Sequence, residues 1–410
     1  MGDEAGRTEG WLRPPRLATG EERSATRLEL FYDLAYVLVV AELAAALLKN
    51  MTWGGVGIFA GLFTVMWFSW VSTTLYANRF DTDDVLFRIA LLTDTAAVAG
   101  CAAAATGGLG GFDIPFAVCF LIGRLILVGL YLRAWWHVRD SRATIVVYLT
   151  STSISATLWA VSLLVPPPAR YVLWGVAVLV EAVAPFIATW RGSTAPLHME
   201  HLPERFGLFV ILVLGEVVAG IVTGVHDAAW AGPSVTVAAV AFVVGAGLWW
   251  IYFDAASVSG QEGLKDGEEE DEEEGGAEDE VDERHDLYIY GHLPLTLGIA
   301  AAGVGLEDLV LHPDAALPSP AVWIAVGGVA LAVVGAGVVL GGVHQRLSAM
   351  WPWPVAALVP LAALTLLGVP VLALVGMLAA IVVIFAVAGA RQKRSGSTPR
   401  PEPAPAAGTE

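Results

Sequence analysis

The chain has 410 residues, of which 56% are hydrophobic and only 15% are charged. Soluble domains carry about 25% charged residues, so this composition excludes an ordinary soluble protein. The formal net charge is −18, but Glu262–Asp286 alone contributes −13, from 15 acidic and two basic residues. The acidity is therefore local and says little about the partners of the chain as a whole.

Twelve apolar segments follow one another along the chain. Each has about 20 residues, the length at which a helix crosses a bilayer core of about 30 Å. This pattern predicts an all-α fold, namely a polytopic integral membrane protein with about twelve transmembrane helices. The predicted helices are Leu28–Leu48, Gly54–Tyr76, Val85–Ala105, Ile114–Trp136, Ala143–Val165, Tyr171–Trp190, Phe206–Gly224, Val235–Phe253, Leu287–Gly305, Ala321–Val343, Met350–Gly368 and Val371–Ala390.

Positively charged residues fall on one side of the membrane in this arrangement. With the N-terminus in the cytoplasm, 19 of the 22 Lys and Arg residues lie in cytoplasmic segments, and only Lys49 and Arg170 lie outside. Such an excess of basic residues marks the cytoplasmic side. We therefore expect both termini in the cytoplasm and the lipid bilayer as the surrounding partner.

The chain is predicted to contain two similar halves. Arg27–Phe31 (R-L-E-L-F) resembles Arg205–Phe209 (R-F-G-L-F), and each opens a long apolar helix. An offset of six helices gives both halves the same orientation in the membrane. The segment 260–286 is too acidic to pack and is predicted to be a disordered cytoplasmic loop, with a docking site for cations or a basic partner as the alternative. The predicted regions are a cytoplasmic basic N-terminal arm at 1–27, a first six-helix half at 28–190, a second half at 191–390 that contains the acidic loop, and a disordered C-terminal tail at 391–410.

Ionisable residues interrupt the apolar helices. A charge at the bilayer centre costs at least about 2.5–3.5 kcal/mol, so such residues are expected to face the inside of the bundle or a cavity. Arg124 and Asp94 form the simplest internal ion pair, because a short glycine-rich turn joins their helices, and this pair serves either packing or transport. The other acids outnumber the internal bases, and protonatable carboxyl groups near the midplane are typical of proton- or cation-coupled carriers. The coupling candidates are Asp33, Glu216, Asp94, Arg124, Glu181, Glu42 and His292.

Helical spacing separates the acids of the first predicted helix. Glu29, Asp33 and Tyr36 are four and three residues apart and share one face, whereas Glu42 lies on the opposite face. His292 has two interpretations, a member of an internal polar network or a buried packing residue.

Two polar motifs lie at the predicted cytoplasmic face. In the turn Asn78–Asp84, the aspartates are suited to cap the next helix, to gate a path or to bind a cation. His198–Glu204 contains two histidines, but their spacing matches no zinc signature, so we expect a polar cap at the start of the next helix and no metal site. The residues of the two motifs are Arg79, Asp81, Asp83, Asp84, His201, Glu204 and Arg205.

Four motifs, in order, resemble the bacterial low temperature requirement A (LtrA) family. They are L-E-L-F-Y-D-L at Leu28–Leu34, N-R-F-D-T-D-D at Asn78–Asp84, H-L-P-E-R-F-G-L-F at His201–Phe209 with L-G-E at Leu214–Glu216, and W-W-I-Y-F-D at Trp249–Asp254. The resemblance implies a multi-pass protein of the bacterial inner membrane with a role in growth at low temperature. It implies no settled molecular activity and no set of functional residues. The family pattern favours an uncharged polar residue at the position of Glu42, which weighs against a proton-carrying role there.

The leading functional hypothesis is transport of a small solute or ion, coupled to protons or cations, with Asp33 and Glu216 at comparable positions in the two halves. The alternative is a membrane sensor or stress-tolerance protein that does not transport and signals through its cytoplasmic loops. The sequence has no nucleophile–base set, phosphate-binding loop or dinucleotide fingerprint, so no enzymatic activity and no cofactor are expected. It has no basic face with interleaved aromatic residues, so no nucleic-acid partner is expected. The oligomeric state is not predicted.

Overall fold

Helices dominate the computed structural model, which describes residues 13–17, 26–81, 83–106, 111–191, 202–253, 278–317, 319–344 and 368–396, together with single residues at 359, 363 and 366. In this part of the chain, eleven helices are long and apolar enough to cross a membrane. This confirms the prediction of an all-α polytopic membrane protein. The helix predicted at Met350–Gly368 lies almost entirely outside the described residues. The helices are α1 (Arg27–Lys49), α2 (Trp53–Arg79), α3 (Val85–Ala105), α4 (Asp113–His137), α5 (Arg142–Ser162), α6 (Ala169–Trp190), α7 (Leu202–Asp227), α8 (Gly232–Trp250), α10 (Glu278–Leu311), α11 (Pro320–His344) and α14 (Val371–Gly396).

Two helix ends correct the predicted disordered segments. The α10 helix starts at Glu278, so residues 278–286 of the acidic segment are helical and not part of a loop. Acidic residues are favourable in the first turn of a helix, which explains why α10 extends into this segment. The α14 helix continues to Gly396, so residues 391–396 are helical and do not belong to the predicted tail.

The predicted N-terminal arm contains a short strand that the sequence did not indicate. This strand, β1 (Arg16–Leu17), pairs antiparallel with β2 (Phe80–Asp81), which follows α2, and Arg16 lies opposite Asp81. The pairing places this part of the arm against the turn between α2 and α3.

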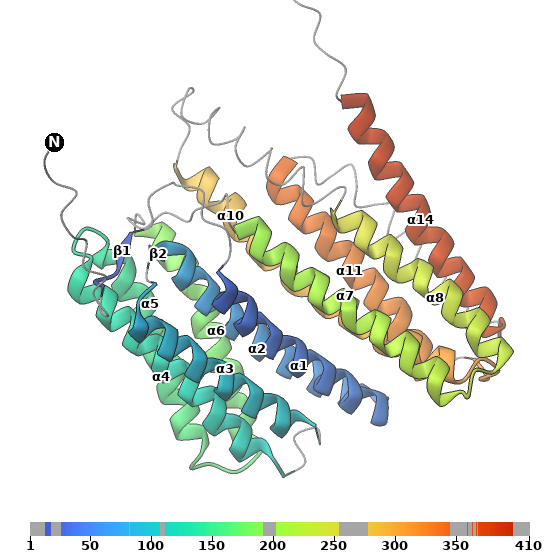
Figure 1. The fold of residues 1–410 in the computed structure, drawn as a ribbon, viewed down its shortest axis with the longest axis horizontal. Helices are drawn as coiled ribbons and strands as arrows, with labels where there is room; N and C mark the ends of the chain where they lie inside the picture. Colours follow the sequence, from blue (N-terminus) through green and yellow to red (C-terminus); the bar gives the residue numbers. More distant parts are fainter. Residues whose placement is uncertain are drawn as a thin grey trace, which may run out of the picture.

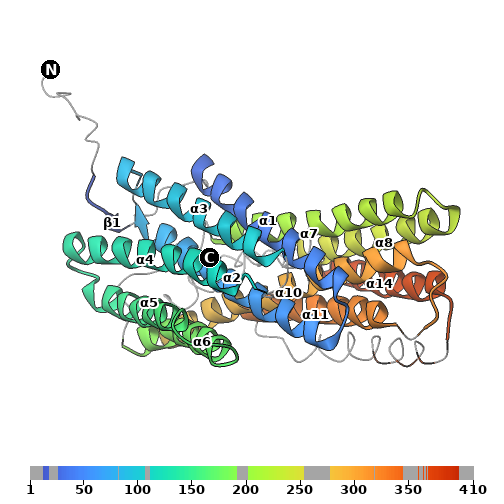
Figure 2. The same cartoon turned by 90° about the horizontal axis from the view of Figure 1, so that it is seen from below.

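The helices form two groups that lie side by side, α1 to α6 in one and α7, α8, α10, α11 and α14 in the other (Figure 1). Figure 2, turned by 90°, shows the same division. Corresponding helices are in contact in both groups: α1 packs against α2 and α3 as α7 packs against α8 and α10, and α2 packs against α6 as α8 packs against α14. An internal repeat would produce this pattern, and the repeat itself stays a prediction.

The two groups of helices meet along α10, which packs against α1, α2 and α6, and along α7, which packs against α1. The hydroxyl group of Tyr290 in α10 donates a hydrogen bond to the carbonyl oxygen of Ala182 in α6, at 2.6 Å. The ring of Tyr290 also stacks on Phe186 of α6, with the ring centres 5.5 Å apart. These contacts bring the start of α10 to the cavity described below.

Candidate functional site

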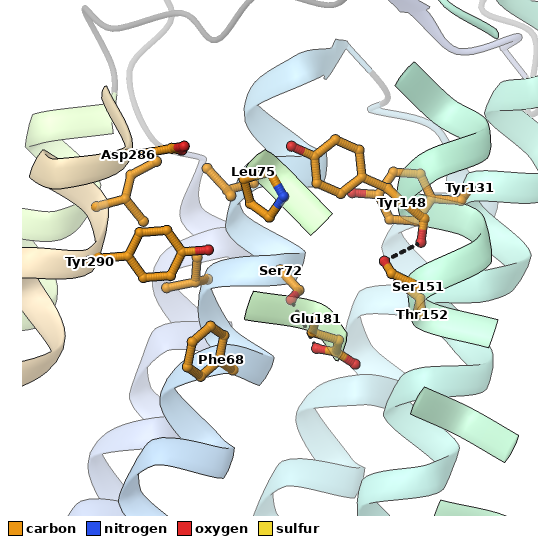
Figure 3. A pocket seen from close by; sticks show the side chains of 13 residues that line it. Phe68, Ser72, Leu75, Tyr131, Tyr148, Ser151, Thr152, Glu181, Asp286 and Tyr290 are labelled. Atoms are coloured by element: carbon orange, nitrogen blue, oxygen red, sulfur yellow. Dashed lines mark hydrogen bonds between the residues drawn. The ribbon is translucent and has the colours of Figure 1, made fainter. Parts of the chain in front are cut away.

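A small cavity with a partly polar lining lies where α2, α4, α5 and α6 meet α10 (Figure 3). Its volume is ≈ 30 Å³. A cavity needs about 10–15 Å³ to hold one water molecule, so this one has room for about two. Its polar lining consists of Ser72, Tyr131, Tyr148, Ser151, Thr152, Glu181, Asp286 and Tyr290.

The Glu181 carboxylate gives the cavity its chemical character. Its Oε2 atom accepts hydrogen bonds from Arg124 Nη1 at 2.9 Å and from Ser72 Oγ at 3.3 Å. Its Oε1 atom is buried and has no hydrogen-bond partner among the described residues. An unmatched buried polar atom costs about 1–3 kcal/mol. The orphan oxygen therefore marks a position where a proton, a water molecule or a cation is stabilised.

Arg124 of α4, which pairs with the Glu181 carboxylate, is completely buried. Its Nη2 atom donates to Ser69 Oγ at 2.5 Å, and its guanidinium lies 5.0 Å from the centre of the Phe120 ring. The predicted ion pair between Arg124 and Asp94 is wrong: in the part of the chain that the structure describes, Arg124 pairs with Glu181. Asp94 instead packs against the α4 backbone, where a Cβ atom at Gly123 would lie 2.5 Å from its Oδ1 atom.

A chain of hydroxyl groups connects Asp94 with the guanidinium. Tyr32 donates to Asp94 Oδ2 at 2.8 Å, and the hydroxyl groups of Tyr32 and Tyr36 are 2.9 Å apart. Tyr36 in turn donates to Ser69 Oγ at 3.1 Å, and the same oxygen accepts the hydrogen bond from Arg124 Nη2. The chain therefore joins α1, α2, α3 and α4 in the interior of the first helix group.

A second arginine binds the acids that share one face of α1. Arg205 of α7 lies 2.9 Å from Asp33 Oδ1 and 3.3 Å from Glu29 Oε2. The indole Nε1 of Trp70 also donates to Asp33 Oδ1, at 2.7 Å. Glu29 additionally forms a capping box with Thr26 at the start of α1. Arg205 thus joins the two helix groups, whereas the sequence suggested that it caps α7.

The rest of the predicted cytoplasmic motifs are spread over several places. Glu204 is exposed in the first turn of α7, and His201 lies outside the described residues. Asp83 forms an exposed ion pair with Arg88 at 2.8 Å. Arg79 is buried, donates to the Tyr148 hydroxyl at 2.8 Å and lies over the Tyr148 ring. Asp81 takes part in β2.

Asp84 caps α3, as one of the three interpretations predicted. It accepts a hydrogen bond from the N–H of Phe87 at 2.9 Å, from the N–H of Arg13 at 3.1 Å and from Arg133 Nη2 at 2.5 Å. Burial alone would raise the pKa of Asp84, but these hydrogen bonds outweigh it and hold the pKa below its ordinary value. The cap therefore ties the N-terminal arm and α4 to the start of α3.

Two further coupling candidates, Glu42 and Glu216, lie close enough for their charges to interact. Glu307 of α10, which the sequence analysis missed, interacts with Glu216 in the same way. All three carboxylates are half-buried, and none forms an ion pair within the described part of the chain. A Cβ atom at Gly220 would lie 2.9 Å from Glu307 Oε2, so this glycine admits the side chain between α7 and α10.

His292 lies in a separate aromatic cluster of the second group. It is completely buried, with Nε2 3.0 Å from the Tyr252 hydroxyl and Nδ1 2.7 Å from the Tyr288 carbonyl oxygen. The ring of Phe206 packs against it at 4.5 Å. Both nitrogens are thus occupied within a packed cluster. Among the residues that the structure describes, no group of three His, Cys, Asp or Glu side chains could hold a metal ion.

The sequence analysis also missed the hydroxyl groups of the site. Ser69 and Ser72 are three residues apart in an apolar helix, and this spacing puts both on one face. Serines are common in membrane helices for packing reasons, so the spacing gave a weak signal. Tyr32 follows Glu29 by three residues and carried the same helical signal as Tyr36.

The fold and the buried ionisable groups define the class of this protein, a multi-pass membrane protein with a charged interior. The family model described as bacterial low temperature requirement A protein (LtrA) matches residues 24–389, so the chain belongs to this family. The resemblance seen in the sequence is thereby confirmed. A relative from Rhizobium meliloti (strain 1021), the uncharacterized protein RA0937, is 28% identical over 314 residues, which cover 74% of this chain and 73% of the relative.

Proposed function

We propose that this LtrA-family protein is a transporter that binds a small ion or solute in the cavity beside Glu181 and couples its movement to protons or cations. The observation that carries the proposal is that the two oxygens of the Glu181 carboxylate differ in their contacts. Oε2 is held by Arg124 and Ser72, whereas the buried Oε1 has no partner among the described residues. The carboxylate is therefore fixed in position with one oxygen left to bind a ligand.

The position of the cavity supports this proposal. Ionisable residues inside a membrane protein typically mark ion paths or proton relays. In many transporters the binding site lies where two structural repeats meet. Here Asp286 and Tyr290 come from the second helix group and Glu181 from the first. The volume of ≈ 30 Å³ favours a proton, a water molecule or a bare monovalent ion over a larger solute.

We also propose that the protein lies in the bacterial inner membrane with both termini in the cytoplasm. The distribution of basic residues supports this orientation. In this orientation the cap formed by Asp84, Arg133 and Arg13 lies at the cytoplasmic ends of α3 and α4.

The test is flux through liposomes that contain the purified protein, with proton gradients and a panel of monovalent cations and small polar solutes. We expect flux with the unaltered protein and its loss in Glu181→Gln. Glu204→Gln makes the same chemical change at an exposed carboxylate and should leave flux unchanged. Absence of flux under every condition, with folded protein, would contradict transport.

A second candidate function, a sensor that does not transport, is favoured by one observation. The N-terminal arm is tied to membrane helices through β1–β2 and through Arg13, whose carbonyl oxygen accepts from Arg133 at 2.5 Å. A change in the tilt of α3 or α4 would therefore move the arm. Crosslinking of the arm that changes with temperature in a protein without flux would support this function.

A further inference from the structure

We infer that Asp94, Arg124 and Glu181 form one proton-binding unit, which holds a single proton on Asp94 in the state seen here. The use of this proton in transport rests on the proposed function, but the proton site itself does not. The inference identifies the coupled ion as a proton and adds Asp94 as a second carrier behind the carboxylate in the cavity.

The charges of the unit leave room for one proton. It contains two carboxylates and one guanidinium, all buried, with exposed fractions of 3% for Asp94, 0% for Arg124 and 8% for Glu181. Fully ionised, the unit would carry one uncompensated negative charge in the membrane interior, which is costly. One bound proton makes it neutral.

The contacts decide which carboxylate takes the proton. Arg124 Nη1 is 2.9 Å from Glu181, so this carboxylate has a counter-charge. Asp94 receives only the neutral hydroxyl of Tyr32, and none of the ion pairs among the described residues includes it. The ionised form is therefore favoured at Glu181 and the neutral form at Asp94.

The groups around Asp94 do not change the net charge of the unit. Tyr32 and Tyr36 face Asp94 from α1, Arg124 interacts with it from α4, and Cys101 interacts with it from its own helix. The two tyrosines and the cysteine are neutral at ordinary pH. Arg124 is therefore the only charge among them.

The groups around Glu181 add no net charge. Tyr131, Tyr148 and Tyr290 line the cavity as neutral phenols. Asp286 lines it from α10, and the guanidinium of Arg79 lies 4.4 Å from the centre of the Tyr148 ring. These two contribute one charge of each sign.

Arg124 couples the two carboxylates because it can neutralise only one of them. When Glu181 takes up a proton from the cavity, its ion pair is lost and the guanidinium favours an ionised Asp94. The single proton of the unit therefore has two positions, on Asp94 while Glu181 pairs with Arg124, or on Glu181 while Asp94 is ionised. The unit holds one proton in both states, so its charge is conserved.

The experiment is infrared spectroscopy of the purified protein in micelles at neutral pH, which measures the C=O band of protonated carboxyl groups. Asp94→Asn should remove the intensity of one carboxyl group. Glu181→Gln should remove the same intensity, because Arg124 then pairs with Asp94 and ionises it. Arg124→Gln should add intensity, because Glu181 loses its counter-charge. Glu204→Gln should change nothing.

The inference fails if Asp94→Asn leaves the band unchanged, or if Glu181→Gln leaves the Asp94 intensity in place. Tyr32→Phe serves as a second probe that keeps every charge, and it should shift the Asp94 band without removing it. Comparison of unfolding temperatures identifies variants that do not fold. The infrared result needs no transport, so an intact proton unit without any flux would remove the proposed transport and leave this inference standing.

Discussion

Arg124 and Arg205 are both buried arginines that bind carboxylates of other helices, yet their surroundings differ. Arg205 has two carboxylates, Asp33 at 2.9 Å and Glu29 at 3.3 Å. Arg124 has one, Glu181 at 2.9 Å, and completes its contacts with neutral oxygens of Ser69. The cavity adjoins Arg124's partner.

These different surroundings indicate a structural ion pair at Arg205 and a binding site at Arg124. Arg205 joins α7 to α1 and therefore the two helix groups, and its partner Glu29 also caps α1. Arg124 lies inside the first group, and its partner Glu181 lines the cavity. Both Asp33 and Glu181 have one buried oxygen without a hydrogen-bond partner among the described residues, so the cavity distinguishes the two carboxylates. We therefore expect Arg205 to govern stability and the Arg124 unit to govern ion binding.

The largest effect is expected for Arg205→Gln. This change leaves two buried carboxylates without their counter-charge, and removing one partner from a buried ion pair typically costs about 3–5 kcal/mol. Thermal unfolding in detergent measures the loss. Arg88→Gln breaks the exposed pair with Asp83 and should change the unfolding temperature little, because solvent screens exposed ion pairs. Equal losses in the two variants would remove the packing role of Arg205.

A smaller loss of stability is expected for Glu181→Gln. The amide oxygen can still accept from Arg124, and Asp94 ionises and becomes the counter-charge of the guanidinium, so we expect a cost of about 1–3 kcal/mol. The same unfolding measurement applies. A loss as large as that of Arg205→Gln would show that the two arginines play the same packing role.

The position of Asp94 can be tested through its neighbour in α4. A Cβ atom at Gly123 would lie 2.5 Å from Asp94 Oδ1, so Gly123→Ala should displace this side chain and cost about 1–3 kcal/mol. Gly129 lies in the same helix with no atom within 4 Å of its added Cβ, so Gly129→Ala is the matched control and should cost nothing. Similar losses in both would contradict the close contact.

The smallest effect concerns pH and the cap of α3. Because the pKa of Asp84 is held below its ordinary value, ionised Asp84 stabilises the fold above the unfolded value of about 4. This contribution disappears as the pH falls through the lower, folded pKa. Unfolding temperatures measured below pH 5 should fall less steeply in Asp84→Asn than in the unaltered protein, and equal slopes would contradict the hydrogen bonds described for Asp84.

The sequence predicted the helices well because length and apolar character alone determine a membrane span. The start of α3 at Val85 and the cap at Asp84 followed from the same local rules. The acids and bases of the site could also be recognised in the sequence, because charged residues inside apolar membrane helices are costly and therefore rare.

The pairing of these charges could not be read from the sequence. The sequence favours a pair of Arg124 with Asp94 because their helices are consecutive, but a long guanidinium side chain reaches a carboxylate of any packed helix, here Glu181 of α6. Arg205 reaches α1, which lies in the other helix group. Glu307 could not be selected from the sequence, because its proximity to Glu216 depends on the packing of α7 against α10.

We expect Glu181, and not the half-buried acid Glu216, to bind the coupled ion. Proton flux driven by a pH gradient should be measured in the same liposome preparation for the unaltered protein, Glu181→Gln and Glu216→Gln, with equal amounts of folded protein. We predict that Glu181→Gln abolishes flux and that Glu216→Gln retains it. Flux that survives in Glu181→Gln and disappears in Glu216→Gln would place the ion at Glu216 and overturn the role proposed for Glu181.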